Sequence, residues 1–173
     1  MARRPRIEIA GYYHIINRGV EQRVIFKEPA DFEYFEALMC FYAKSYGITL
    51  HNYCLMTNHY HLLIEIQEEN LSKFMRQLNM NYAIYFNKKY KRVGHLWQGR
   101  FKSWYVTDEA YLYTLMLYIE QNPLKAKMVK HLEEYPYCQV QSKNVPQRRA
   151  NMYQLATKKV APPVKEFLPF VFV

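Results

Sequence analysis

Glycine and cysteine are scarce in this sequence, and long apolar runs are missing. The five glycines are scattered and form neither a P-loop nor a GxGxxG pattern, so we expect no phosphate-cradling nucleotide site. The cysteines Cys40, Cys54 and Cys138 are odd in number and widely spaced, which predicts reduced, packed thiols instead of a disulfide framework. No apolar run reaches the roughly 20 residues that a membrane-spanning helix needs. Because no apolar signal segment follows the first residues either, we expect a cytoplasmic protein without membrane contact.

Excess positive charge is the main compositional feature. Lys and Arg number 24 against 15 Asp and Glu, which gives a formal net charge of +9. Such an excess favours a polyanionic partner, with nucleic acid as the first candidate. Half of the residues are hydrophobic and 17% are aromatic, which is enough to build the core of one domain.

The spacing of apolar residues predicts an alternation of strands and helices. The expected elements are a strand at 11–17, a helix at 31–46, a hairpin of strands 48–56 and 60–66, a helix at 70–90, a strand at 100–106 and a helix at 108–122. The first six have the β-α-β-β-α-β order of a ferredoxin-like α+β fold, whose helices cover one face of an antiparallel sheet and leave the other available for a ligand. We expect this domain to span residues 1–130 and a C-terminal extension, 131–173, to pack on it or to contact a nucleic acid.

Two histidines, His59 and His61, begin the third expected strand. Because strand side chains alternate between faces, both imidazoles point the same way and could converge on one metal ion. The pair alone is a weak signal, since such pairs are more often structural. His14 on the first strand could approach the same site. In the last helix, Tyr118 and Asn122 are four residues apart and share a face, although a core stripe and a helix-ending asparagine would also explain them.

Three motifs that follow one another along the chain carry a family resemblance. They are Tyr53-Cys-Leu-Met-Thr-Asn-His59-Tyr-His61, Trp97-Gln-Gly-Arg-Phe-Lys102 and Tyr118-Ile-Glu-Gln-Asn-Pro123. From about residue 10 to residue 130 the chain resembles the Y1 transposases of the HUH superfamily, and more narrowly the REP-associated tyrosine transposases, relatives of the IS200/IS605 enzymes. The resemblance implies a metal-dependent enzyme that cleaves and transfers single-stranded DNA at or near REP-like hairpins through a 5′-phosphotyrosine intermediate.

The resemblance also implies a role for each residue of the site. His59 and His61 would be metal ligands and Tyr118 the nucleophile. Asn122 would be the third ligand, and Gln121 ranks second because it points about 100° away from Asn122 on an ideal helix. Two imidazoles, an amide oxygen, a DNA phosphate and waters together suit Mg²⁺ or Mn²⁺.

The last motif departs from the family pattern where it ends. The usual Asn-Pro-Val-Arg-Ala-Gly continuation is Asn122-Pro-Leu-Lys-Ala-Lys127 in this chain. A basic residue is kept, but the glycine is replaced by lysine. We expect this change to affect the end of the helix and any dimer contacts, and not the activity.

Basic and aromatic residues alternate from Arg100 to Tyr105, a mixture suited to phosphates and to stacked, unpaired bases. The residues expected to contact DNA are Arg4 in the N-terminal arm, Asn17, Arg18 and Arg23 after the first strand, and Arg100 and Lys102 in this stretch. The REP-associated branch implies a monomer, which we favour, whereas the IS200/IS605 relatives imply a dimer.

Two functions of other classes remain open from the sequence. One is a ferredoxin-like nucleic-acid-binding module without catalysis, and the other is a catalytically inactive descendant that represses palindromic DNA. Both explain the charge and the tyrosines. Neither explains why two histidines on one strand face and a tyrosine-asparagine helix pair occur together. A covalent protein-DNA adduct would distinguish the enzyme from both.

Overall fold

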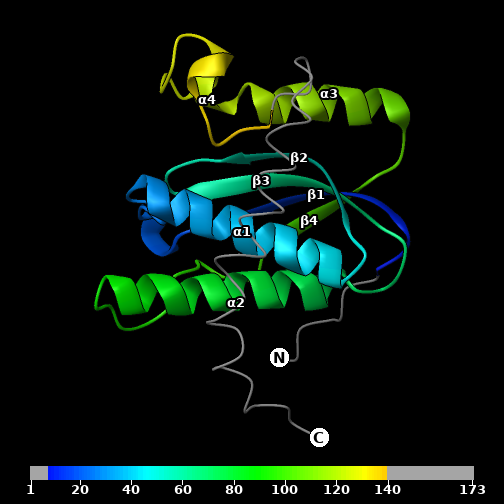
Figure 1. Cartoon of the computed structure of the whole chain (residues 1–173). Helices are drawn as coiled ribbons and strands as arrows, with labels where there is room; N and C mark the ends of the chain where they lie inside the picture. The colour runs from blue at the N-terminus through cyan, green and yellow to red at the C-terminus, as the bar shows by residue number, and fades with distance from the viewer. Residues whose placement is uncertain (1–7, 140–173) are drawn as a thin grey trace, which may run out of the picture.

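The computed structural model describes residues 8–139 (Figure 1). Its elements are β1 (Gly11–Arg18), the 3-10 turn η1 (Val20–Gln22), α1 (Pro29–Ser45), β2 (Thr49–Leu55), β3 (His59–Ile66), α2 (Leu71–Lys89), β4 (Lys102–Val106), α3 (Glu109–Glu120), α4 (Asn122–Lys125) and η2 (Leu132–Glu134). Each predicted strand and helix is present, with ends shifted by a few residues. The short helix α4 was not expected.

The four strands form one antiparallel sheet in the order β2-β3-β1-β4. This is the order of a ferredoxin-like β-α-β-β-α-β fold, so the predicted α+β class is confirmed. Helices α1 and α2 cover one face of the sheet, and α3 lies across the other (Figure 1). The face predicted to be open is thus partly covered by the helix that carries Tyr118. Within residues 8–139, no helix combines the length and apolar character that crossing a membrane requires.

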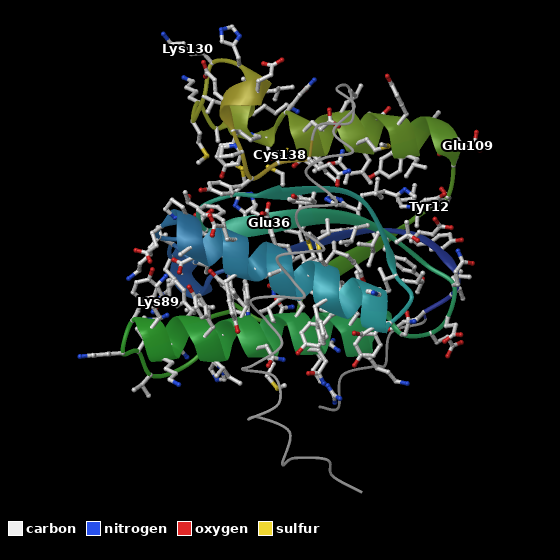
Figure 2. All side chains as sticks on the ribbon, viewed as in Figure 1. Tyr12, Glu36, Lys89, Glu109, Lys130 and Cys138 are labelled. Atoms are coloured by element: carbon white, nitrogen blue, oxygen red, sulfur yellow. The ribbon has the colours of Figure 1, made fainter. Side chains whose placement is uncertain are left out.

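Side chains fill the spaces on both sides of the sheet (Figure 2). The larger core lies between the sheet and helices α1 and α2, and its fully buried members include Phe35, Tyr60 and Tyr82. A smaller core, which includes Leu63, Leu115 and Ile119, lies between the sheet and α3. The second core holds α3 in place on the sheet by apolar contacts and so fixes the position of its polar residues.

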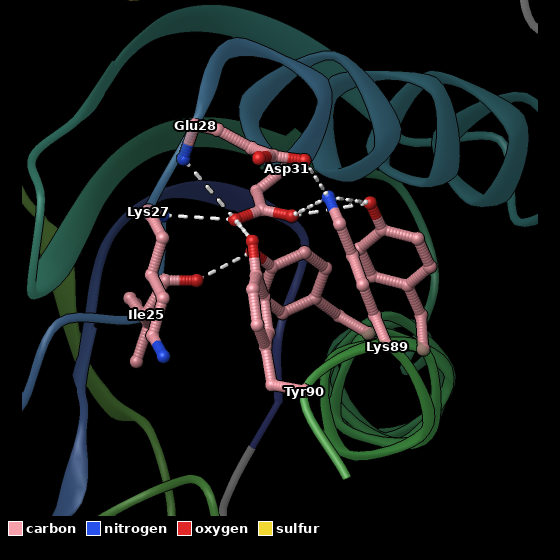
Figure 3. Close-up of polar contacts among 8 residues, drawn as sticks. Ile25, Lys27, Glu28, Asp31, Lys89 and Tyr90 are labelled. Atoms are coloured by element: carbon pink, nitrogen blue, oxygen red, sulfur yellow. Dashed lines mark hydrogen bonds and ion pairs between the residues drawn. The ribbon is translucent and has the colours of Figure 1, made fainter.

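A buried carboxylate joins α1 to α2 on the side of the larger core (Figure 3). Asp31, in the first turn of α1, has a fully buried side chain. It accepts hydrogen bonds from Lys89 Nζ at 2.6 Å, Tyr90 Oη at 2.7 Å, Tyr85 Oη at 3.1 Å and the Lys27 backbone N–H at 2.8 Å. Burial raises the pKa of Asp31, but these hydrogen bonds outweigh it, and the pKa lies below its ordinary value.

The segment after α4 packs against β2, at the edge of the sheet. Tyr135 Oη donates to the Leu55 carbonyl at 2.6 Å, and backbone hydrogen bonds join residues 137 and 139 to β2. Cys138 lies opposite Cys54, and both are buried and outside any disulfide, as is Cys40, which agrees with the prediction of packed thiols. The rest of the predicted extension, from residue 140, lies outside the described residues, as does the arm before residue 8.

Two caps define the ends of the helical segment that carries the tyrosine. The Asp108 carboxylate accepts a hydrogen bond from the Tyr111 backbone N–H at 2.8 Å, which caps α3 as the sequence predicts. After α3 ends at Glu120, the chain forms the short helix α4, and Pro123 lies in its first turn. The backbone N–H that proline lacks is not needed at this position, since N–H groups of a first turn have no partner within the helix. Two residues after the end of α4, Lys127 lies in the left-handed region, with φ of 54°, a conformation that favours glycine.

Candidate active site on the α3 face of the sheet

Alternation along β3 separates its first three side chains. Tyr60 points into the larger core, where it is fully buried and its Oη donates to Asn79 Oδ1 at 2.7 Å. His59 and His61 point to the opposite face, with ring centroids 5.1 Å apart. The geometry of the strand therefore places two imidazoles side by side, as their spacing predicts.

Helix α3 brings Tyr118 next to His61 and to His14 of β1. The Tyr118 ring centroid lies 5.7 Å from that of His61 and 6.3 Å from that of His14, in both cases edge to face. Tyr118 keeps 40% of its surface exposed, whereas His61 keeps 3%. Lys125 in α4 places its Nζ 4.8 Å from the centre of the Tyr118 ring. A phenol, two imidazoles and a cation thus meet at one accessible position, and all of them belong to one chain.

Asn122, the first residue of α4, is hydrogen-bonded to the last turn of α3, which carries Tyr118. Its Nδ2 donates to the Tyr118 carbonyl at 2.9 Å and to the Ile119 carbonyl at 3.3 Å. Because the amide nitrogen is used in this way, the oxygen Oδ1 is the atom that could serve as a metal ligand. Gln121 is the C-terminal cap residue of α3 and is exposed.

Burial favours the neutral form of both strand histidines. It lowers the pKa of His61 to about 3, with smaller contributions from His59 and His14. Burial also lowers the pKa of His59, and the nearby charge of Arg18 lowers it further. A neutral imidazole offers a nitrogen lone pair, which is the form that binds a metal ion.

The nitrogen that His59 can offer follows from its neighbour. His59 Nδ1 lies 2.7 Å from Asn58 Oδ1, while Asn58 Nδ2 donates to the Gln22 carbonyl at 3.1 Å. The second bond fixes the orientation of the amide, so its oxygen faces His59 and can only accept. Nδ1 of His59 therefore carries the proton, and Nε2 has the free lone pair.

The donor set suits an ion that completes its coordination with other molecules. Among residues 8–139 no three His, Cys, Asp or Glu side chains are arranged to hold a metal. A set of two imidazole nitrogens and one amide oxygen would leave room for a substrate phosphate and water, which would fit Mg²⁺ or Mn²⁺ better than a closed structural zinc site. The thiol of Cys138, together with burial, raises the pKa of Cys54, which keeps this thiol protonated and unsuited to zinc.

The residues expected to contact DNA occupy different environments. Arg18 is exposed, pairs across the sheet with His59 and donates from Nε to Gln98 Oε1; Lys102 and Arg100 are exposed near the same end of the sheet. Arg23 forms an ion pair with Glu21 at 3.0 Å. Asn17 is 6% exposed and pairs with Tyr60 on the core face, a position that offers little surface to DNA. Arg4 lies outside the described residues.

The sequence assigned no role at the site to Asn58 or Lys125, and it placed Trp104 only within a stretch suited to binding DNA. Asn58 orients His59, Lys125 lies against Tyr118, and Trp104 is 45% exposed with its ring centroid 5.5 Å from that of His14. Lys125 follows Tyr118 by seven residues, two helical turns, and this spacing was the available signal. Trp104 lies two residues after Lys102 on β4, so strand alternation puts both on the α3 face.

Comparison with known proteins shows a family match and similarity to solved structures. The model of the family described as "Transposase IS200 like" matches residues 9–122, more than half of the chain. The structure of a REP-associated tyrosine transposase bound to a REP hairpin is similar, with a TM-score of 0.67 and 16% identity, covering 80% of this chain and 82% of that one; at this identity it shows a shared fold. A transposase-like protein from Deinococcus radiodurans R1 is 17% identical over 70% of this chain and 97% of its own, but its TM-score of 0.49 supports no inference. None of the curated proteins matches.

Proposed function

The chain belongs to the IS200-like transposase family, and from this premise we propose that it cleaves and rejoins single-stranded DNA at or beside a hairpin, with Tyr118 as the nucleophile. The observation that carries the proposal is the approach of Tyr118 to His61, with ring centroids 5.7 Å apart within one chain. A hairpin substrate is further supported by the similar transposase structure, which is bound to a REP hairpin. We also propose a cytoplasmic location, as expected from the sequence. Such a location agrees with an enzyme that acts on DNA.

In the proposed reaction the Tyr118 oxygen attacks the scissile phosphorus in line with the 3′ oxygen. The Tyr118 hydroxyl gives up its proton as its oxygen bonds to phosphorus, the bond from phosphorus to the 3′ oxygen breaks, and the leaving oxygen takes up one proton, so that charge and protons balance. The new 5′-phosphotyrosine keeps the energy of the broken bond. Attack by another 3′-hydroxyl then releases Tyr118 and rejoins the strand. The Lys125 ammonium, 4.8 Å from the Tyr118 ring, would stabilise the negative charge of the phosphate.

His59, His61 and Asn122 are the proposed ligands of a divalent ion, Mg²⁺ or Mn²⁺. Such an ion, when bound, polarises the scissile phosphate and orients it. The chain's own contribution is to hold two neutral imidazoles in fixed orientations and to hold Asn122 beside the tyrosine through the Tyr118 carbonyl. HUH enzymes generally use a divalent metal, which agrees with this donor set.

We place the DNA along the α3 face, at the end of the sheet where the histidines lie. Arg18, Lys102 and Arg100 would contact phosphates, and the half-exposed ring of Trp104 would stack on an unpaired base. Asn17 is left out of this surface because it is buried. Since one chain contains every proposed residue of the site, we favour a monomer that acts alone.

The nucleophile can be tested with a labelled oligonucleotide that has a REP-like hairpin and a single-stranded flank. With Mg²⁺ or Mn²⁺ the wild type should form a covalent adduct that survives denaturing gel electrophoresis, and Tyr118→Phe should form none. Tyr113→Phe is the matched control, since Tyr113 lies on the same helix and is 67% exposed. An adduct in Tyr118→Phe would disprove the assignment.

The same assay separates the enzyme from its alternatives. The double variant His59→Ala and His61→Ala should lose metal-dependent nicking while keeping most of its affinity for the hairpin. If the wild type bound the hairpin but never formed an adduct, a binding module or an inactive repressor would be the better description.

A further inference from the structure

A third histidine lies behind the proposed ligands. His14, on β1, is 6% exposed and is held between Trp104 on β4 and His61 on β3. Its Nε2 lies 3.1 Å from Nδ1 of His61, and the two ring planes differ by only 14°. A third imidazole this close to a ligand would be either a further ligand or a partner of that ligand.

The geometry distinguishes these two roles. The ring centroids are 5.4 Å apart; taking away the 3.1 Å between the nitrogens leaves 2.3 Å. This remainder is twice the radius of a five-membered ring, roughly 1.15 Å for bonds near 1.33 Å. The two nitrogens therefore lie on the line between the ring centres, in a common plane. Lone pairs that point at one another in this way cannot both reach one metal ion, but they are well placed for a linear N–H···N hydrogen bond.

We propose that His14 is a positioning residue that holds His61 with its proton on Nδ1 and its Nε2 lone pair free for the metal. Between two neutral imidazoles a single proton occupies the bond, so one ring donates and the other accepts. Only the arrangement in which His61 donates leaves His61 Nε2 able to bind a metal. The inference rests on the proposed metal site and adds a residue to it.

The two ligands then have equivalent supports from different parts of the chain. Asn58 Oδ1 accepts from Nδ1 of His59, and His14 Nε2 accepts from Nδ1 of His61. Both ligands would then offer Nε2, and both rings would be fixed before the metal arrives. Partners of this kind commonly change metal affinity or activity by about 10–100-fold when they are removed.

Two substitutions of His14 test the proposal in the full-length protein. His14→Leu fills a similar volume without a hydrogen bond, and His14→Gln puts an amide oxygen near the position of Nε2, where it can still accept. We expect Mn²⁺ binding, measured by electron paramagnetic resonance without DNA, to weaken about 10–100-fold in His14→Leu and to recover most of this loss in His14→Gln. Thermal unfolding of each variant checks that it folds.

The position of the proton gives a readout that does not depend on metal or activity. Long-range ¹H–¹⁵N spectra of the metal-free protein should show His61 protonated on Nδ1 in the wild type and in His14→Gln, and on Nε2 to a larger extent in His14→Leu. A wild type with the His61 proton on Nε2 would overturn the inference. Loss of Mn²⁺ binding in both variants alike would overturn it too, because it would make His14 a ligand.

The failure of this inference differs from failure of the proposed function. The Tyr118→Phe adduct assay tests the nucleophile and is independent of the His61 proton. Suppose that no adduct formed, but that the His61 proton lay on Nδ1 in the wild type and in His14→Gln and not in His14→Leu. The positioning role of His14 would then be supported and the proposed enzymatic activity would not. If the adduct formed but the His61 proton stayed on the same nitrogen in all His14 variants, the proposed enzyme would stand and the positioning role of His14 would be wrong.

Discussion

Replacing Asp31 with asparagine tests how α1 and α2 are held together. The side chain of Asp31 is fully buried and accepts from the Lys89 ammonium at 2.6 Å, from two tyrosine hydroxyls and from the backbone (Figure 3). An asparagine side chain at this position could accept only through one oxygen, and its amide N–H groups would face other donors. Removing one partner of a buried ion pair typically costs about 3–5 kcal/mol. The lower end applies, because Lys89 is 25% exposed and keeps Glu28 at 2.5 Å.

We therefore expect Asp31→Asn to lower the free energy of unfolding by about 3 kcal/mol at neutral pH, or Tm by roughly 6–12 °C for a chain of this size. Urea and thermal unfolding followed by circular dichroism measure both quantities. Tyr90→Phe is the control, since it removes one hydroxyl donor and no charge and should cost about 1 kcal/mol. If Asp31→Asn lowered the free energy of unfolding no more than Tyr90→Phe does, the carboxylate would not be the main stabilising contact between α1 and α2.

The effect of pH gives a second check on the same residue. The pKa of Asp31 is lowered in the folded state, so the ionised carboxylate stabilises the fold above the ordinary value of about 3.9. This stabilisation is lost as the pH falls through the lower, folded-state pKa. The stability gap between wild type and Asp31→Asn should therefore be full near pH 7 and shrink below about pH 4. A gap that stayed constant would contradict the argument.

Three further substitutions test local features. Lys127→Gly should raise the free energy of unfolding in urea by about 0.5–1 kcal/mol, because glycine adopts a positive φ without steric strain. The greater freedom of glycine in the unfolded chain offsets part of this gain. Lys127→Ala is the control and should bring no such gain. Asp108→Ala should destabilise by about 1 kcal/mol and increase amide exchange in the first turn of α3, and unchanged exchange would show that the cap is dispensable. Tyr60→Phe should lower stability by about 1–2 kcal/mol, because Asn79 Oδ1 loses its buried donor, while adduct formation stays unchanged.

Local patterns predict the elements of this fold well, because apolar spacing and turn residues report which face of each element is buried. The same alternation that puts His59 and His61 on one face would also have placed Asn17, two residues after the buried Ile15, in the core. Its polar side chain and its place before a turn suggested the surface instead.

Contacts between distant segments were beyond such patterns. The contact between His61 and His14 depends on the register between β1 and β3, and the bond between Asp31 and Lys89 depends on how α1 packs on α2. Neither is encoded by spacing along one segment. The approach of Tyr118 to His61 came only from the family resemblance, since the helix could have packed in other ways.

The segment that follows α4 has a consequence for the sheet as a whole. β2 is an edge strand, and an uncovered edge presents backbone donors and acceptors on which another chain can add as a further strand. In this protein the backbone of residues 137–139 already occupies part of that edge, through Leu55 N to Tyr137 O and Gln139 N to Tyr53 O, each at 2.9 Å. These few residues thus block the addition of another strand at this part of the β2 edge. A shortened form of the protein would keep this block only if it ended beyond Gln139.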